Sequence, residues 1–336
     1  MRKIRILHIV DNLSINNGVS SVLMNWYRAI NKEKYQFDFL VCYKRNSSYE
    51  EEIKKLGGKI YYLLEKEKLT KYIALIKNTK VFFKQNNYSV IHLHSPTLVG
   101  FMFHYGKKYG VKHRIIHSHS TSYADSKIKN LRNKILLKPL NTLATEYVAC
   151  SNDAGSFLFL KNKFTVLNNG IDFTKYSFNK KKRHSIRKKW NIDEKTLVVG
   201  HISNMSELKR VDLVIEMLRK LSEIEKNIKL VLCGKTELPN AIKELINEYE
   251  LDDFIINVGI VEDIPAILST MDVCFMPSDK EGLGLVAVEC QANGLPVFVS
   301  EGFPKDVFIS NKIYPINKIK NNDLYNTFIR LKEERT

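Results

Sequence analysis

Short apolar runs alternate with longer amphipathic stretches along nearly the whole chain. The runs are five to seven residues long, and stretches such as 19–30, 71–85, 210–224 and 237–250 repeat apolar residues every three to four positions. Strands alternating with helices are typical of parallel α/β folds. We predict strands at residues 4–10, 36–42, 58–63, 90–94, 114–119, 147–151, 164–168, 197–203, 228–234, 254–259, 273–277 and 296–300.

The alternation stops once, over residues 169–196, which are polar, basic and poor in strand signal. We therefore predict two Rossmann-like, doubly wound domains, residues 1–168 and 197–316, joined by a linker at 169–196. A ligand is expected in a cleft where the strands end. The last stretch, 317–336, is a candidate helix that packs back on the first domain.

Length and composition agree with a globular protein of two domains. The chain has 336 residues, 44% of them hydrophobic and 26% charged. It holds no run of 18 apolar residues, and the apolar start, 4–10, lacks a signal-peptide cleavage site. The five cysteines are scattered and form no C-x-x-C motif. We interpret them as core residues of a cytoplasmic protein, without disulfides or a zinc site.

The net positive charge of the chain lies entirely in its first half. Residues 1–168 carry 28 Lys and Arg against 11 Asp and Glu, whereas residues 169–336 carry 25 of each. Such asymmetry suggests that one half faces an anionic partner, either a nucleic acid or a membrane surface. A lysine-rich genome is the alternative, although it should affect both halves equally.

Two acidic residues stand out in the segment DKEGLGLVAVECQANGLP, residues 279–296. The pattern predicts a helix over 283–292 that ends at Asn293-Gly294, with Glu281 just before it and Glu289 among apolar neighbours. A helix N-terminus near glycines suits hydroxyls or an anion. A buried carboxylate without a partner is costly, so Glu289 is expected to bind something.

The spacing of these two carboxylates limits their joint role. Eight helical residues separate them by about 12 Å, too far for a retaining glycosidase pair. They could grip the two ends of an elongated ligand. Alternatively, Glu281 complements the helix dipole and Glu289 pairs with a basic core residue; spacing alone leaves the two interpretations equal.

The sequence from 280 to 300, KEGLGLVAVECQANGLPVFVS, resembles the signature of family 4 glycosyltransferases, in their bacterial capsule and exopolysaccharide branch. Four further segments resemble that family in the same order along the chain. They are NNGVSSVLMNWYRAI (16–30), NNGIDFTKYSF (168–178), GHISNMSELKRVDLVIEML (200–218) and NVGIVEDIPAILSTMDVCFMPS (257–278). The resemblance implies the GT-B fold, two Rossmann-like domains that face each other across a cleft, and retention of anomeric configuration.

The resemblance also assigns roles to single residues. Glu289 would accept hydrogen bonds from the ribose hydroxyls of a nucleotide-sugar, and Glu281 would face the donor sugar. Lys209 would meet the diphosphate. The donor would also contact the residues Gly18, Asn204, Gly282, Leu283 and Gly284, and His119 would act beside the reacting sugar.

In such enzymes a donor phosphate oxygen is thought to take the acceptor proton, and no protein nucleophile is used. The chain has no Asp-x-Asp motif, so the resemblance implies no bound metal and no cofactor beyond the nucleotide-sugar itself. Positioning and electrostatics would supply most of the rate.

Each candidate has a simpler structural interpretation. Gly18 could be only a turn residue, and Lys209 a solvated charge at a helix start. His119 shares a strand face with His117, so one of the two could be a core histidine. The pair His92 and His94 suggests metal ligands, but no third ligand accompanies it in the sequence, and we interpret it as structural.

Two positions depart from the family pattern. Asn17-Gly18 stands where a Gly-Gly pair is usual. Asn204 stands where the family commonly has an arginine, so one bidentate phosphate contact is missing. Arg210 or His201 could compensate for the missing charge.

The segment 127–143 places five apolar residues near helical spacing among basic ones. It is predicted as an amphipathic helix that leans on a membrane or as an ordinary helix with a solvated basic face. With a lipid-linked acceptor, the basic first half would dock the protein at the inner face of the plasma membrane.

The sequence thus predicts a cytoplasmic, peripherally membrane-associated glycosyltransferase that uses a nucleotide-sugar, most readily a UDP-sugar, and a glycan or polyprenyl-diphosphate-linked acceptor. The alternative is a catalytically silent GT-B partner or chaperone of an active transferase. A nucleic-acid binder is motivated by charge alone, without a binding motif. A dinucleotide oxidoreductase lacks its glycine fingerprint after strand 4–10.

Overall fold

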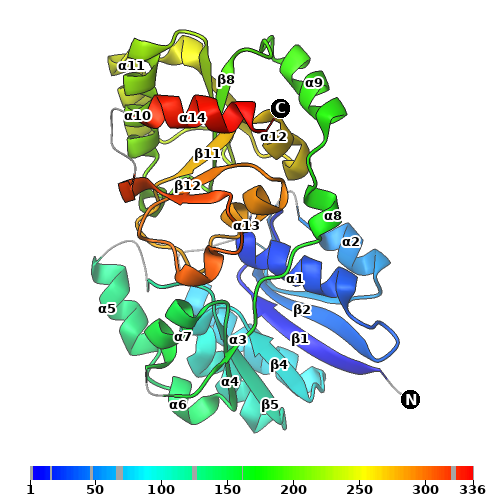
Figure 1. Cartoon of the computed structure of the whole chain (residues 1–336). Helices are drawn as coiled ribbons and strands as arrows, with labels where there is room; N and C mark the ends of the chain where they lie inside the picture. Colours follow the sequence, from blue (N-terminus) through cyan, green and yellow to red (C-terminus); the bar gives the residue numbers. More distant parts are fainter. Residues whose placement is uncertain are drawn as a thin grey trace. The chain divides into compact units, whose positions relative to one another are not determined.

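Two parallel sheets organise the computed structural model of the protein, one in each half of the chain (Figure 1). The structure describes residues 3–15, 17–45, 48–65, 71–122, 127–160, 162–318 and 323–335. It divides into two units, residues 1–170 and 171–336.

The sheet of the first unit has seven strands in the order β3-β2-β1-β4-β5-β6-β7. Its apolar strands are buried, as expected for a parallel sheet covered on both faces. The pairing of β1 with β4 sets His8 beside His92. The strands are β1 (Ile4–Val10), β2 (Tyr35–Tyr43), β3 (Ile60–Leu64), β4 (Val90–Leu93), β5 (His113–Ser118), β6 (Glu146–Ala149) and β7 (Thr165–Val166).

The first helix of this unit shows why the sequence folds this way. Asn17 caps it by accepting a hydrogen bond from the backbone N–H of Ser20, and Leu23 and Tyr27 reach a core that includes Phe39 of β2. The helices are α1 (Gly18–Ala29), α2 (Glu50–Lys55), α3 (Lys71–Gln85), α4 (Val99–Lys108), α5 (Lys127–Leu136), α6 (Leu140–Leu143) and α7 (Asn152–Phe159).

The sheet of the second unit has six strands in the order β10-β9-β8-β11-β12-β13. The strands are β8 (Leu197–Ile202), β9 (Ile228–Cys233), β10 (Ile255–Gly259), β11 (Val273–Met276), β12 (Val297–Val299) and β13 (Ile313–Pro315). Its helices are α8 (Phe173–Tyr176), α9 (Lys180–Lys189), α10 (Val211–Ile224), α11 (Asn240–Glu248), α12 (Ile264–Thr270), α13 (Leu285–Ala292) and α14 (Leu324–Glu333).

Alternate strand residues of the second sheet pack against α10, α11 and α14 in one core. Phe328 and Leu331 of α14 belong to that core, and the Phe328 ring lies 4.7 Å from that of Phe298 on β12. The apolar positions of α14 thus complete the second unit's own core. That the segment 317–336 packs back on the first domain stays a prediction.

The segment 169–196, predicted as a linker, contains α8 and α9. Two arginines of α9 bind the fully buried Asp272, which precedes β11. Arg183 Nη2 lies 2.7 Å and Arg187 Nη1 3.3 Å from its carboxylate. Removing one member of such a buried ion network costs about 3–5 kcal/mol. Most of this segment is therefore part of the second unit.

The predicted fold class is confirmed, because both sheets are parallel and doubly wound. Every predicted strand overlaps an observed one, whereas β13 has only three residues and was not predicted. All five cysteines are buried thiols outside any disulfide. Within the part of the chain that the structure describes, no helix is long and apolar enough to cross a membrane.

Candidate functional site

The strand order of the second sheet reverses between β8 and β11, which lie side by side. Such a reversal leaves a crevice at the carboxyl ends of the two strands, where open α/β sheets bind ligands. Lys209 follows β8 and Glu281 follows β11. Lys209 Nζ lies 2.6 Å from Glu281 Oε1, and the two side chains are only 21% and 10% exposed. The structure thus brings together two predicted site residues that are 72 positions apart.

Backbone hydrogen bonds fix the two segments that carry this pair. The N–H of Asp279 donates to the carbonyl of Leu208 at 2.8 Å, which joins the two loops directly. The N–H of Glu281 donates to the carbonyl of Gly302 at 2.9 Å. The ion pair therefore sits on a backbone that is tied on both sides.

The glycine-rich turn after Glu281 leads into α13. Helix α13 begins at Leu285, two residues later than predicted, because Gly284 adopts a left-handed φ of +83°. A Cβ at Gly284 would lie 2.3 Å from the Phe303 ring, so both backbone and packing require glycine. Among the described residues no side chain caps α13, so the positive end of the helix dipole faces the turn that follows Glu281.

Glu289 lies inside α13 and is only 6% exposed. Among the described residues it has no ion-pair partner, and its Oε1 accepts a hydrogen bond from the Tyr176 hydroxyl at 2.7 Å. Burial raises the pKa of Glu289 to about 7, against the smaller opposing effect of that hydrogen bond. A salt bridge to a core lysine or arginine, the structural alternative considered above, is thus not found.

Tyr176 was not predicted as a site residue. It ends α8, in the segment NNGIDFTKYSF, and its ring is buried. The sequence offers no signal for this contact, because 113 residues separate Tyr176 from Glu289.

Asn204 stands at the place of the missing arginine, and Arg210 and His201 were considered as substitutes for its charge. Asn204 is exposed, and its Oδ1 accepts from the N–H of Ser206. The guanidinium of Arg210 binds Asp212 at 2.8 Å and Asp279 at 3.2 Å. His201 is fully buried, and burial lowers its pKa to about 4, so it is neutral at pH 7.

Two predicted site residues belong to the first unit. Gly18 opens α1. Apart from its chain neighbours and the backbone of its own helix, no described atom lies within 4 Å of a Cβ built there, and its φ is not positive. Neither packing nor backbone conformation therefore requires glycine at this position. His119 is half-buried, its Nε2 lies 2.8 Å from Nδ1 of His94, and burial lowers its pKa to about 3. It is therefore a neutral imidazole at pH 7.

Two family models match successive parts of the chain. Residues 16–175 match the model described as Glycosyltransferase Family 4, and residues 182–330 match Glycosyl transferases group 1. The fold and the matches define a glycosyltransferase of the GT-B class.

Curated relatives assign the chain to a family within that class. It is 31% identical over 313 residues to EpsF of Bacillus subtilis (strain 168), named as a glycosyltransferase, covering 90% of this chain and 80% of EpsF. It is 25% identical to the capsular polysaccharide biosynthesis glycosyltransferase CapH of Staphylococcus aureus, over 88% of this chain and 81% of CapH. The chain belongs to the family 4 glycosyltransferases that include these proteins.

Solved structures agree on the fold. Anabaena HepE in complex with UDP-glucose matches 98% of this chain and 90% of its own, with a TM-score of 0.77 at 16% identity. WaaG, a glycosyltransferase involved in lipopolysaccharide biosynthesis, matches with a TM-score of 0.78 at 13% identity, over 98% of this chain and 90% of its own.

The raised pKa of Glu289 predicts a specific dependence of stability on pH. Because its folded pKa is about 7 and its unfolded value 4.5, the native state holds the proton more tightly. The resulting stability is complete below pH 4.5 and is lost as the pH rises to 7 and above. Between pH 4.5 and pH 8, Glu289→Gln should gain up to about 3 kcal/mol in unfolding free energy relative to the parent.

Denaturant unfolding of both proteins at several pH values measures this difference. The exposed Glu262→Gln serves as a control and should track the parent throughout. A constant offset between Glu289→Gln and the parent would show that Glu289 is not buried as described.

Proposed function

We propose that the protein is a retaining glycosyltransferase that moves a sugar from a UDP-sugar to a glycan or polyprenyl-diphosphate-linked acceptor in surface polysaccharide synthesis. The observation that carries the proposal is the contact between Lys209 and Glu281 at the strand reversal of the second sheet. A relative supports the donor and acceptor classes. The Escherichia coli UDP-Gal:alpha-D-GlcNAc-diphosphoundecaprenol alpha-1,3-galactosyltransferase is 24% identical over 92% of this chain and 82% of its own length.

Three side chains would each bind a different part of the nucleotide-sugar donor. The Lys209 ammonium neutralises charge on the diphosphate, and Glu281 accepts hydrogen bonds from hydroxyls of the sugar. Glu289 accepts from the ribose hydroxyls. The pKa of Glu289 is about 7. Hydrogen bonds from the ribose hydroxyls favour the charged carboxylate, so Glu289 becomes fully ionised near neutral pH when the nucleotide-sugar binds. The backbone of Gly282, Leu283 and Gly284 lies beside the sugar, and Gly18 and Asn204 contact the donor.

In the proposed reaction the bond from the anomeric carbon to the β-phosphate oxygen breaks, and the acceptor oxygen bonds to that carbon on the same face. The acceptor proton passes to a phosphate oxygen, and UDP leaves. Lys209 stabilises the charge that grows on the leaving diphosphate. The transfer uses no protein nucleophile and no metal ion.

His119 is proposed to contact the reacting sugar as a neutral imidazole. Burial keeps its pKa near 3, so it offers one hydrogen-bond donor and one acceptor rather than a positive charge. Its contact with His94 fixes the orientation of the ring.

One observation favours a second candidate function, a catalytically silent partner of another transferase. Asn204 carries no charge, Arg210 is held by two carboxylates, and His201 is neutral. In the described loop 203–210, between β8 and α10, Lys209 would then be the one cation that no aspartate neutralises, and Glu281 already binds it. This candidate predicts that UDP-sugars do not bind and that an active transferase co-purifies.

The transfer proposal predicts a large loss of activity when the ion pair is broken. Lys209→Met and Glu281→Gln should each lower kcat about 10²–10³-fold, the usual cost of removing one group that stabilises transition-state charge. UDP release from UDP-glucose, UDP-galactose and UDP-N-acetylglucosamine measures it, with Lys220→Met on the exposed face of α10 as the control.

Equal activity in the parent, both site variants and the control would overturn the site assignment. A parent protein that binds and turns over none of the three donors, but co-purifies with an active transferase, would instead support the silent partner. Circular dichroism of each variant separates these results from misfolding.

Membrane association is proposed to use α5. Leu131 and Ile135 lie one turn apart on α5 and are 65% and 54% exposed, with Lys134 between them. The predicted single helix over 127–143 is instead two helices, because Pro139 interrupts it before Leu140, which is buried. The exposed apolar pair is therefore confined to the first of the two.

Replacing this pair should weaken binding to anionic lipid. Leu131→Asp with Ile135→Asp is expected to reduce sedimentation with phosphatidylglycerol vesicles at least about tenfold, because it removes apolar insertion and adds negative charge. Ile224→Asp, at an equally exposed position in the second unit, is the control. Unchanged sedimentation of the double variant would exclude α5 as the membrane contact.

A further inference from the structure

Histidines gather on one face of the first sheet, where β1, β4 and β5 lie side by side. The strand order reverses between β1 and β4, so this face lies at the first sheet's own reversal point. Parallel pairing sets His8 beside His92, and alternation along each strand keeps the others on the same face. The members of this histidine cluster are His8, His92, His94, His117 and His119.

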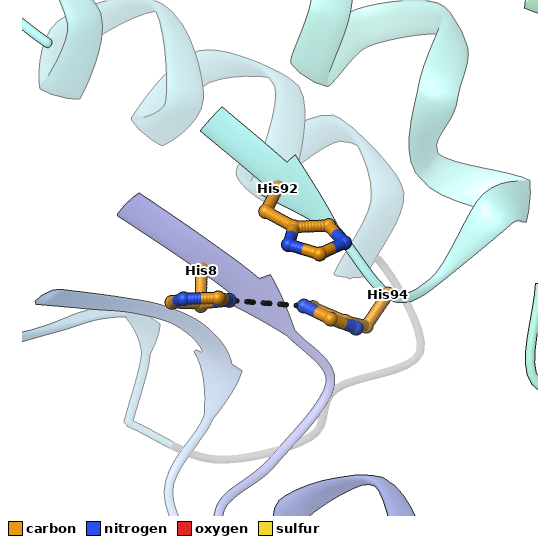
Figure 2. Close-up of side chains that lie close together, drawn as sticks. All are labelled: His8, His92 and His94. Atoms are coloured by element: carbon orange, nitrogen blue, oxygen red, sulfur yellow. Dashed lines mark hydrogen bonds between the residues drawn. The ribbon is translucent and has the colours of Figure 1, made fainter. Parts of the chain in front are cut away.

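Three of these histidines form a compact group, which Figure 2 shows with their rings close together. His8, His92 and His94 are 1%, 7% and 5% exposed, and each offers a ring nitrogen within 4.8 Å of the others'. His8 Nδ1 lies 3.0 Å from His94 Nε2. The three side chains come from two strands and the residue that follows the second, elements that the sheet holds rigidly.

His117 and His119 lie outside this group, and each contacts one of its members. His119 Nε2 lies 2.8 Å from Nδ1 of His94, and His117 Nδ1 lies 3.1 Å from Nε2 of His92. These contacts leave Nδ1 of His92 unused, and Nε2 of His94 faces Nδ1 of His8. Histidines that bind a metal usually have their second ring nitrogen fixed by such a hydrogen bond.

The cluster also contains polar atoms that the described protein does not satisfy. Nε2 of His8 and Nε2 of His117 are buried and have no hydrogen-bond partner among the described residues. Buried polar atoms without partners are rare and need an explanation. A metal cation accepts nitrogen lone pairs, so it would explain why imidazole nitrogens are buried here without hydrogen-bond partners.

We propose that His8, His92 and His94 form a three-imidazole site for a divalent transition-metal ion of the zinc type. Three imidazoles with water in a fourth position are a ligand set that Zn²⁺ uses, and imidazole also suits Cu²⁺ and Ni²⁺. Tetrahedral coordination at about 2.0–2.1 Å brings the nitrogens to about 3.4 Å from one another. The ring nitrogens lie within 4.8 Å of one another, so ion binding would draw them to this spacing.

This site was not recognised in the sequence, where His92 and His94 lack a third ligand nearby. His8 lies 84 positions before His92 and joins it only through the pairing of β1 with β4. The ion is not part of the proposed sugar transfer, so the two proposals fail independently.

The test is a titration of metal-stripped, tag-free protein with Co²⁺, followed by displacement with Zn²⁺. The expected result is one equivalent of Co²⁺ with the visible absorption of a four-coordinate ion, and a rise in Tm with Zn²⁺. His8→Gln and His92→Asn should each weaken binding at least about 100-fold. His104→Ala, an exposed histidine on α4, is the matched control and should bind like the parent.

His119→Ala tests the outer contact and should weaken binding by about 10–100-fold without abolishing it. Circular dichroism and unfolding of the metal-free variants show whether each one folds. Absence of a stoichiometric Co²⁺ spectrum in the parent would overturn the proposal, as would binding that survives His8→Gln and disappears in His119→Ala. The latter result would move the ion to the group His94, His117 and His119.

Discussion

The reversal of strand order in each sheet is the constraint on which the rest of this structure depends. In the second unit the chain adds β9 and β10 on one side of β8, and β11, β12 and β13 on the other. The segments after β8 and β11 therefore separate above the sheet, and residues from both face the same edge. Lys209 and Glu281 meet there although 72 positions separate them. In the first unit the same kind of reversal, between β1 and β4, gathers the histidine cluster.

The second unit treats its buried charges in two ways. Asp272 is surrounded by Arg183, Arg187 and the N–H of Val198, a network that attaches α9 to the sheet. Among the described residues, the side-chain hydrogen bond that Glu289 accepts comes from the Tyr176 hydroxyl, and burial raises the pKa of Glu289 to about 7. The buried charge of Asp272 is fully paired, and its partners stabilise the fold. The arrangement at Glu289 leaves a carboxylate with unused capacity to accept hydrogen bonds, which is what binding a diol requires.

The sequence was a good guide wherever a property is local. Periodicity predicted the strands, the Asn293-Gly294 pair predicted the end of α13, and Gly294 indeed has a left-handed φ of +68°. The carboxylates at 281 and 289 stood out by their positions alone. Gly284 shifted the start of α13 by two residues, because its left-handed backbone ends the turn before the helix begins.

The sequence was a poor guide wherever a property depends on which distant segments meet. Tyr176 on Glu289 and His8 beside His92 are contacts across 113 and 84 positions, and no spacing rule connects them. The amphipathic pattern of α14 shows that the helix has an apolar face but not which core that face completes, and the structure places Phe328 and Leu331 in the core of the second unit. Arg210 seemed available as a phosphate ligand until the structure placed Asp212 and Asp279 on its guanidinium.

The central claim is that the second unit's reversal point holds a nucleotide-sugar, with one acid for the ribose and an ion pair for the diphosphate and sugar. A crystal structure of the protein with UDP tests it most directly. The account predicts ribose hydroxyls donating to Glu289 and the diphosphate in contact with the Lys209 ammonium. UDP bound elsewhere, with Glu289 still held only by Tyr176 and Lys209 only by Glu281, would contradict it.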